Sequence, residues 1–127
     1  MNRIKLIIIL IISLTIVSCD KEMYYHFVIS NESGNDLTVQ FKALDDAVKT
    51  VLIPEGIKDT VYIFMIIEGT KIYERKISWI FEEITIKKDT VYSSIDYLLN
   101  ENWVYKEYSD TYAEYLLTVD STHFEYP

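Results

Sequence analysis

The chain has 127 residues, of which 20 are acidic and 12 are basic, and its formal net charge is −8. This length fits one domain that is large enough to bury a hydrophobic core. The negative charge disfavours nucleic acid and anionic lipid headgroups as partners, and one cysteine with three glycines excludes a disulfide framework and a glycine-rich phosphate loop.

The first 18 residues have the organisation of a secretory signal peptide. Arg3 and Lys5 make the start of the chain positive, and no acidic residue precedes Asp20. The apolar run from Leu6 to Val17 is shorter than the roughly 18–20 residues that a transmembrane helix needs. A short apolar run with a positive flank only before it is typical of a signal peptide that is removed, rather than of a membrane-spanning anchor.

The end of this leader, Ile16-Val17-Ser18-Cys19, resembles the lipobox of bacterial lipoproteins, with Ile16 where leucine is usual. In that family a diacylglycerol is attached to the cysteine, the preceding peptide bond is cut, and the new amino terminus is acylated. The resemblance therefore implies that Cys19 is lipidated, and two or more acyl chains, at about 0.8 kcal/mol per buried CH₂, hold a protein stably on a bilayer. The alternative is a free thiol, an unusual leftover in a secreted protein.

The segment after the cysteine, Asp20-Lys21-Glu22, resembles the acid-rich sorting signals of Bacteroidota lipoproteins, although a plain solvated tether explains it equally well. We expect a protein of the bacterial cell envelope, anchored at the outer membrane. Its expected parts are a signal peptide at 1–18, a lipidated cysteine with a tether at 19–22, and a domain at 23–127. Because both basic residues of the leader are removed, ten basic and twenty acidic residues remain, a charge of −10.

The rest of the chain favours β-structure. Val, Ile, Thr, Phe and Tyr dominate, and these residues suit a pleated, half-buried surface. The predicted strands are Met23–Ser30, Asp36–Ala43, Val48–Pro54, Asp59–Ile67, Glu83–Lys87, Thr90–Ile95, Asn102–Tyr108 and Ala113–Asp120. Short strands at this spacing predict an all-β fold, a single antiparallel β-sandwich of about seven or eight strands.

Individual segments differ in how clearly they indicate a structure. In Asp36–Ala43, apolar residues alternate with polar ones, so that Leu37, Val39, Phe41 and Ala43 should face the core. Asp59–Ile67 is apolar on both faces, which predicts a central or fully covered strand. Thr70–Ile84 fits either a helix or a strand, and we favour an extended conformation because its surroundings are β; Ser93–Asn100 could form a helical turn capped by Ser93 or Ser94.

The sequence offers no complete set of catalytic residues, so we expect a protein that is not an enzyme and has no cofactor. A nucleophilic hydrolase needs a nucleophile, a base and an orienting group, but the cysteine is expected to carry lipid, and His26 and His123 lie far apart in the sequence. Two isolated histidines also fall short of a zinc site. The acidic pairs Asp45-Asp46 and Glu82-Glu83 leave calcium open, although such pairs are usually solvated.

Four aromatic residues near the carboxyl terminus are the candidate ligand-binding residues: Trp103, Tyr105, Tyr108 and Tyr112. They stand among carboxylates, and exposed rings beside carboxylates suit a sugar face or a hot spot for a protein partner. The alternative is that Trp103 lies in the core and the tyrosines pair across strands. We expect Trp79 in the core.

The domain is similar to small Bacteroidota lipoproteins of uncharacterised role, in its Val28–Phe41 strand–loop–strand segment, the Trp of Asn100–Tyr105 and the closing Tyr112–Glu125 stretch. The resemblance implies an immunoglobulin-like sandwich and transfers no functional residues. We expect a lipid-anchored, non-catalytic envelope protein that binds a protein or glycan partner. The alternative is an inhibitor or immunity-type protein whose acidic surface blocks a cationic enzyme such as a lysozyme.

Overall fold

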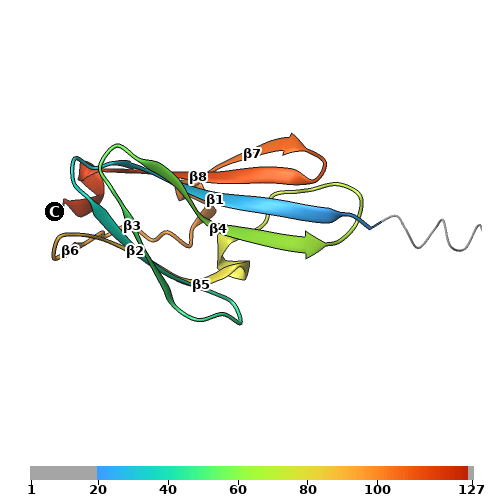
Figure 1. Cartoon of the computed structure of the whole chain (residues 1–127), viewed down its shortest axis with the longest axis horizontal. Helices are drawn as coiled ribbons and strands as arrows, with labels where there is room; N and C mark the ends of the chain where they lie inside the picture. Colours follow the sequence, from blue (N-terminus) through green and yellow to red (C-terminus); the bar gives the residue numbers. More distant parts are fainter. Residues whose placement is uncertain (1–19, 126–127) are drawn as a thin grey trace, which may run out of the picture.

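The computed structural model describes residues 20–125, which form two four-stranded sheets (Figure 1). The strands are β1 (Glu22–Glu32), β2 (Leu37–Ala43), β3 (Lys49–Ile53), β4 (Lys58–Ile67), β5 (Phe81–Lys88), β6 (Val91–Tyr92), β7 (Val104–Ser109) and β8 (Tyr112–Asp120). Three 3-10 turns complete the described chain: η1 (Ile77–Trp79), η2 (Asn100–Asn102) and η3 (Ser121–Phe124). The predicted all-β sandwich is confirmed. The predicted signal peptide and Cys19 lie outside the described residues.

The two sheets have strand orders β4-β1-β8-β7, called sheet A, and β3-β2-β5-β6, called sheet B. Most neighbouring strands are antiparallel, as expected, but the first and last strands, β1 and β8, run parallel. This pairing is long-range, and no turn between the two strands signals it in the sequence. It puts the amino-terminal strand in the interior of sheet A, between β4 and β8.

The core lies between the sheets and is rich in aromatic rings. In β2, Leu37, Val39, Phe41 and Ala43 are buried, which confirms the predicted alternation. Phe27 of β1 is central: other rings of the core surround it on several sides, from both sheets and from the loops. Its contacts are Phe81 at 4.8 Å, Tyr115 stacked at 4.9 Å and Trp103 at 5.8 Å. Burying each such side chain contributes about 1.5–3 kcal/mol, so a disulfide-free core of this kind can stabilise the fold.

One buried polar side chain fastens the end of the sandwich farthest from the amino terminus. Asn31, fully buried, donates from Nδ2 to the carbonyl of Ile53 at 2.9 Å and to that of Asn35 at 2.7 Å. Its Oδ1 accepts from the backbone N–H of Ser33 at 3.0 Å and from the Ser33 hydroxyl at 2.7 Å. The amide therefore joins β1, the following loop and β3, and all its hydrogen-bonding groups are satisfied, as burial requires.

The segment 70–84 is not the alternative helix, and of the extended conformation that we favoured only the part from Phe81 onward is a strand. Its first part is irregular, and η1 follows. Its backbone N–H groups donate to residues that are distant in the sequence, rather than to a neighbouring strand. The N–H of Ile72 donates to the carbonyl of Asp110. The N–H of Arg75 donates to the hydroxyl of Tyr115, and that of Ile77 to Oδ1 of Asn100. These distant partners, which the local sequence does not reveal, fix the path of the segment.

The predicted helical turn at Ser93–Asn100 is also replaced by irregular structure, with η2 beginning only at Asn100. Ser93 does accept a hydrogen bond from the N–H of Ile95 at 3.2 Å, but it also donates to the carbonyl of His123 at 3.1 Å. The serine thus ties this segment to η3 instead of starting a helix. Burial raises the pKa of the neighbouring Tyr97, which is almost fully buried, to about 12.

The described part of the chain enters at one end of sheet A, and its last turn, η3, lies at the opposite end of the molecule (Figure 1). Lys21 exchanges backbone hydrogen bonds with the start of the β4–η1 loop, to Gly69 and from Glu68, both at 3.3 Å. Lys21 and Glu22, which the sequence placed in the tether, therefore belong to the folded domain. Among residues 20–125, no helix is long and apolar enough to cross a bilayer.

Candidate functional site

The two sheets present outer faces of different chemistry. On sheet B the outward side chains are mainly polar, with Leu52 and Tyr92 as apolar exceptions on its two edge strands. The polar ones are Thr38, Gln40, Lys42, Thr50, Glu83, Thr85 and Lys87. On sheet A the outward side chains include six large apolar ones that are between 38% and 66% exposed, with charged residues such as Glu22, Lys106 and Glu114 beside them. These six are Tyr24, Ile63, Met65, Ile67, Val104 and Tyr108.

We call these six side chains, together with the half-buried His26 and Tyr112, the apolar face. The register makes it continuous: Tyr24 of β1 lies opposite Met65 of β4 on one side and opposite Tyr112 of β8 on the other. His26 likewise lies opposite Ile63 of β4. The face therefore crosses the sheet from strand to strand, because residues two apart on a strand share one side.

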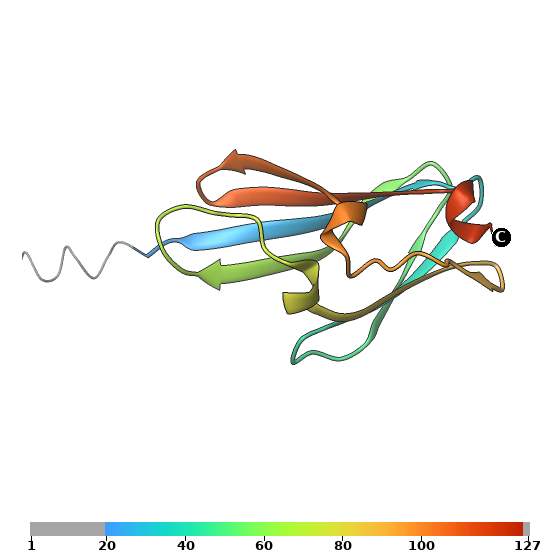
Figure 2. The ribbon, with the colours of Figure 1, turned by 180° about the vertical axis from the view of Figure 1, so that it is seen from behind.

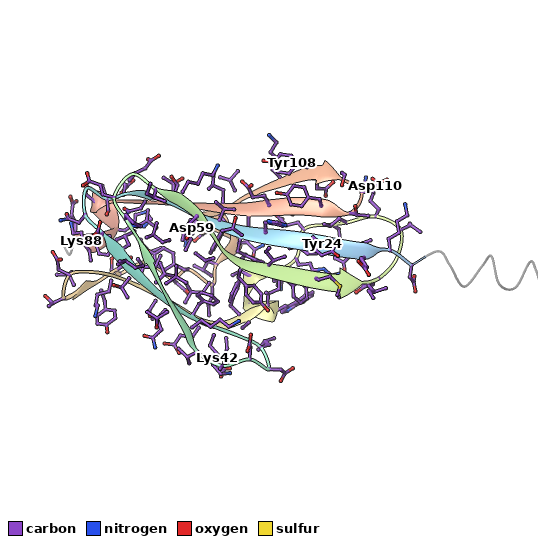
Figure 3. The ribbon with its side chains drawn as sticks, in the orientation of Figure 1. Tyr24, Lys42, Asp59, Lys88, Tyr108 and Asp110 are labelled. Atoms are coloured by element: carbon purple, nitrogen blue, oxygen red, sulfur yellow. The ribbon has the colours of Figure 1, made fainter. Side chains whose placement is uncertain are left out.

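The rings of the apolar face support one another. Tyr108 stacks on Tyr112 with ring centroids 5.1 Å apart, and His26 meets the Tyr112 ring edge-on at 4.7 Å. Partial burial, and then the nearby Glu114 carboxylate, raise the pKa of Tyr112 above its ordinary value. Tyr24 and Tyr108 lie in the half of the molecule where the chain enters, and Lys88 marks the opposite end (Figure 3).

The four predicted ligand-binding rings separate into two pairs. Trp103 is only 7% exposed, and its Nε1 donates to the carbonyl of Tyr97 at 2.8 Å, so it belongs to the core, as the alternative interpretation had it. Tyr105 also points to the core, where its ring centroid lies 4.9 Å from that of Tyr115. Tyr108 and Tyr112 reach the apolar face. The sequence analysis did not identify the other residues of the apolar face, which lie chiefly on β4. The sequence could have indicated them, because this strand is apolar on both sides.

The predicted central position of β4 is wrong, because β4 is an edge strand of sheet A. Its outward side chains are apolar and exposed, rather than covered by another layer. Within residues 20–125, β4 pairs only with β1, so the other side of its backbone has no strand beside it. The run from Val61 to Ile67 contains no charge, glycine or proline.

The other edge strands carry the features that usually protect a sheet edge from pairing. β7 contains Lys106 and Glu107 and has an irregular register next to them. β3 is five residues long, begins with Lys49 and is followed by Pro54, and β6 has two residues. β4 shares some of these features, with Lys58 and Asp59 at its start and a register shift at Val61, but within the described residues its run from Tyr62 to Ile67 is a longer stretch of edge without them.

Trp79, expected in the core, is 61% exposed. The 3-10 turn η1 buries Ile77 and directs Trp79 outward, where the ammonium group of Lys76 lies 5.5 Å from its ring centroid. A cleft of about 490 Å³ lies beside this turn, between residues 74–78 and 98–100. This region is separate from the apolar face.

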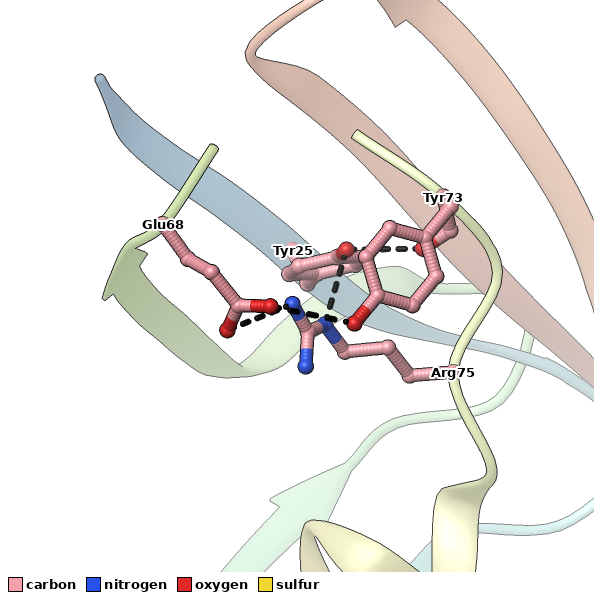
Figure 4. A network of polar contacts seen from close by, with 4 residues as sticks. All are labelled: Tyr25, Glu68, Tyr73 and Arg75. Atoms are coloured by element: carbon pink, nitrogen blue, oxygen red, sulfur yellow. Dashed lines mark hydrogen bonds and ion pairs between the residues drawn. The ribbon is translucent and has the colours of Figure 1, made fainter. Parts of the chain in front are cut away.

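The loop between β4 and η1 is fastened by a buried arginine (Figure 4). The side chain of Arg75 donates from Nε to the hydroxyl of Tyr25 at 3.0 Å, and its Nη2 lies 3.2 Å from a carboxylate oxygen of Glu68. The Tyr25 hydroxyl in turn donates to the carbonyl of Tyr73 at 2.7 Å, and the Tyr73 ring covers the guanidinium at 4.4 Å. With its charge paired, Arg75 has the contacts of a structural residue, and it holds the neighbouring Glu74 and Lys76 in place.

Residues 20–125 contain no group of three or more His, Cys, Asp or Glu side chains placed to hold a metal ion. The acidic pairs that left calcium open each have a lysine partner: Asp46 pairs with Lys49 at 3.1 Å, and Glu82 pairs with Lys42. His123, far from His26 in the fold, lies with Nδ1 3.0 Å from the Tyr97 hydroxyl.

No family model, curated protein or solved structure matches this chain. The strongest features for a binding site are therefore its own: a set of exposed large apolar side chains on the outer face of sheet A, a mainly polar outer face on sheet B, and the uncharged end of the edge strand β4, which borders the apolar face.

Proposed function

We propose that this chain is a lipid-anchored, non-catalytic protein of the bacterial cell envelope, held at the outer membrane through Cys19, and that its sandwich binds a protein partner. The partner docks on the apolar face and on the adjoining edge of β4. The contrast between the two outer faces carries the proposal, because sheet A exposes six large apolar side chains on its outer face, whereas sheet B exposes Leu52 and Tyr92. Contiguous exposed apolar patches on soluble domains mark interaction sites.

The edge of β4 favours a polypeptide partner over a glycan. An extended segment of another protein can continue the ladder with its own N–H and C=O groups, whereas a sugar cannot. Its side chains on the outer side would lie next to Ile63, Met65 and Ile67, which are exposed and apolar. Tyrosine and methionine, both present on the apolar face, are enriched at the centres of protein interfaces.

The expected anchor argues against a second copy as the occupant of this edge. β1 begins next to Ile67, so the anchored end of the domain is the Ile67 end of β4, and Lys58 is at the far end. Two residues lie between Cys19 and the start of β1 at Glu22, and the three steps along the chain span at most about 10 Å. Antiparallel pairing of two β4 strands would put the two anchors at opposite ends, which one membrane does not allow.

A second candidate function, inhibition of a cationic enzyme, is favoured by the charge of the domain. The twelve basic residues of the chain include Arg3 and Lys5 of the leader, so ten remain in the domain against twenty acidic residues. A field of this sign steers a basic protein to the surface, with an association rate that falls steeply as salt is added. Inhibition of a basic enzyme with this salt dependence would support the second candidate, and salt-independent binding to a partner would support the first.

The test of the docking surface uses the full-length chain in its native envelope with a photo-crosslinking residue at one position. With the probe at Met65, on the apolar face, we expect a crosslink to one protein. With the probe at Gln40, exposed on the outer face of sheet B, we expect none. Ile63→Lys places a charge of the kind that keeps edge strands from pairing with another chain, and it should abolish the crosslink at position 65. Equal crosslinking from both positions would contradict the proposal.

The test of the anchor is metabolic labelling with a radioactive fatty acid. The wild-type chain should be labelled and found with the membrane. Cys19→Ala should be unlabelled. Equal labelling of the two chains would contradict lipidation at Cys19.

A further inference from the structure

The cleft beside η1 lies between two segments that are far apart in the sequence. Figure 2 shows η1 and η2 on the same side of the sandwich, and the segments that lead to them form the two walls. The cleft has a volume of about 490 Å³. Its lining residues are Glu74, Lys76, Ser78, Leu98, Leu99 and Asn100.

The first wall is polar because the chain there is extended and its side chains alternate. Arg75 and Ile77 point to the core, with the Arg75 side chain 10% exposed and Ile77 fully buried. The residues between and beside them, Glu74, Lys76 and Ser78, consequently line the cleft. Within residues 20–125, neither the Glu74 carboxylate nor the Ser78 hydroxyl has a hydrogen-bond partner, and both remain available to a ligand.

The second wall is apolar, and a single side chain fixes its distance from the first. Leu98 and Leu99 provide the apolar surface, and Leu99 is exposed. Asn100 accepts from the N–H of Ile77 at 2.9 Å and donates to the carbonyl of Arg75 at 2.8 Å. Both ends of the Asn100 amide therefore bind the opposite wall, and the cleft has its shape before a ligand enters, as binding sites usually do.

Trp79 is not a lining residue of the cleft, but it presents an exposed aromatic surface next to it. It adjoins Ser78, and Lys76, which lines the cleft, also lies 5.5 Å from the centroid of its ring. Within the described residues, the Trp79 ring makes a cation–π contact with Lys76, and Trp79 is 61% exposed to solvent. A large exposed tryptophan contributes little to folding, and its flat face suits a ligand with an apolar side.

We propose that this cleft binds a neutral pyranose ring of a glycan. A pyranose has hydroxyl groups around its edge and an apolar C–H face, and the cleft presents both complements. Glu74 accepts from the hydroxyls and Ser78 both donates and accepts, while Leu98 and Leu99 contact the C–H face within the cleft and Trp79 offers a further exposed apolar surface beside Ser78. The excess of acidic residues on the domain disfavours sugars that carry carboxylate or phosphate.

This inference does not rest on the proposed protein partner, because the cleft and the apolar face share no residue. Its test uses the purified full-length chain in detergent, carrying Trp103→Phe so that Trp79 is the one tryptophan left. Maltotetraose, cellotetraose and chitotetraose serve as probes, and tryptophan fluorescence is the readout. We expect a saturable change with one of them at concentrations up to roughly 10 mM, in the weak range of single-site affinities.

Variants of the cleft make the result specific. Glu74→Gln should weaken binding about tenfold, equivalent to about 1.4 kcal/mol. Trp79→Ala should weaken it at least as much, which retention on an immobilised form of the same sugar measures without fluorescence. Met65→Ala, on the apolar face, is the matched control and should leave sugar binding unchanged. No response to any of the three sugars, or a response that Glu74→Gln and Trp79→Ala leave intact, would overturn the proposal. Protection of Trp79 by a peptide instead of a sugar would also overturn it.

Discussion

Replacing Asn31 by alanine should destabilise the domain more than any other loss of a small polar side chain at its far end. The side chain is fully buried and makes hydrogen bonds in two directions, to the carbonyl of Ile53 on β3 and from the N–H and hydroxyl of Ser33. Alanine leaves these partners without their bonds, in a place that water cannot reach without opening the loop.

The expected cost follows from these contacts. Each buried group that loses its partner costs about 1–3 kcal/mol. The Ile53 carbonyl and the Ser33 N–H are the groups that alanine leaves unpaired inside the protein, so we expect a total of about 3 kcal/mol. At roughly 4–8 °C per kcal/mol for a domain of about 100 residues, the melting temperature should fall by more than about 10 °C.

Differential scanning calorimetry of the full-length chain in detergent measures this change. Gln40→Ala is the matched control, because Gln40 is exposed on β2, and it should change stability by less than about 0.5 kcal/mol. A melting temperature of Asn31→Ala within about 2 °C of wild type, against the roughly 4–8 °C expected per kcal/mol, would refute the assigned role of the buried amide.

Three further outcomes are expected. Phe27→Ala removes the ring at the centre of the aromatic core and should cost about 3–5 kcal/mol in urea unfolding, and a cost near zero would contradict the packing described. Burial raises the pKa of Tyr97 to about 12 from 10.0, so the folded state holds its proton more tightly than the unfolded state. Stability should therefore be intact below pH 10 and fall between pH 10 and 12, and Tyr97→Phe should flatten that part of the pH profile; an unchanged profile would count against it. Ile63→Lys, at an exposed edge position, should keep the melting temperature within the change that about 0.5 kcal/mol produces, and a large loss of stability would show that Ile63 is packed.

The strands were predictable where one side of the strand meets the core and the other meets water. In β2 the alternation of Leu37, Val39 and Phe41 with polar residues is a direct consequence of this environment, and the structure confirms it. The same rule separates the candidate rings: on β7, Tyr105 and Tyr108 differ by an odd number of positions, so they point to opposite sides. The alternation of side chains along a strand, applied to each candidate ring separately, would have placed Tyr105 toward the core and Tyr108 toward solvent.

The rest depended on information that a local pattern does not contain. A strand that is apolar on both sides fits a covered position and also fits an exposed surface that serves a partner, so β4 could not be placed from its residues. Trp79 was misplaced because period-two reasoning assumes a straight chain, whereas η1 bends it between Ile77 and Phe81. The groups that stabilise this bend, Asn100 and the Tyr115 hydroxyl, come from distant parts of the sequence.

Hydrogen exchange at the edge of β4 shows whether a partner strand pairs there. Amide exchange of residues 61–67 is measured in the full-length chain, once in native envelope vesicles and once after purification in detergent, with the edge strand β3 as internal reference. If a partner strand pairs with β4, the amides in this range that point away from β1 should exchange at least about tenfold more slowly in the envelope, while those of β3 are unchanged. Equal exchange rates at β4 in the two preparations would contradict the account.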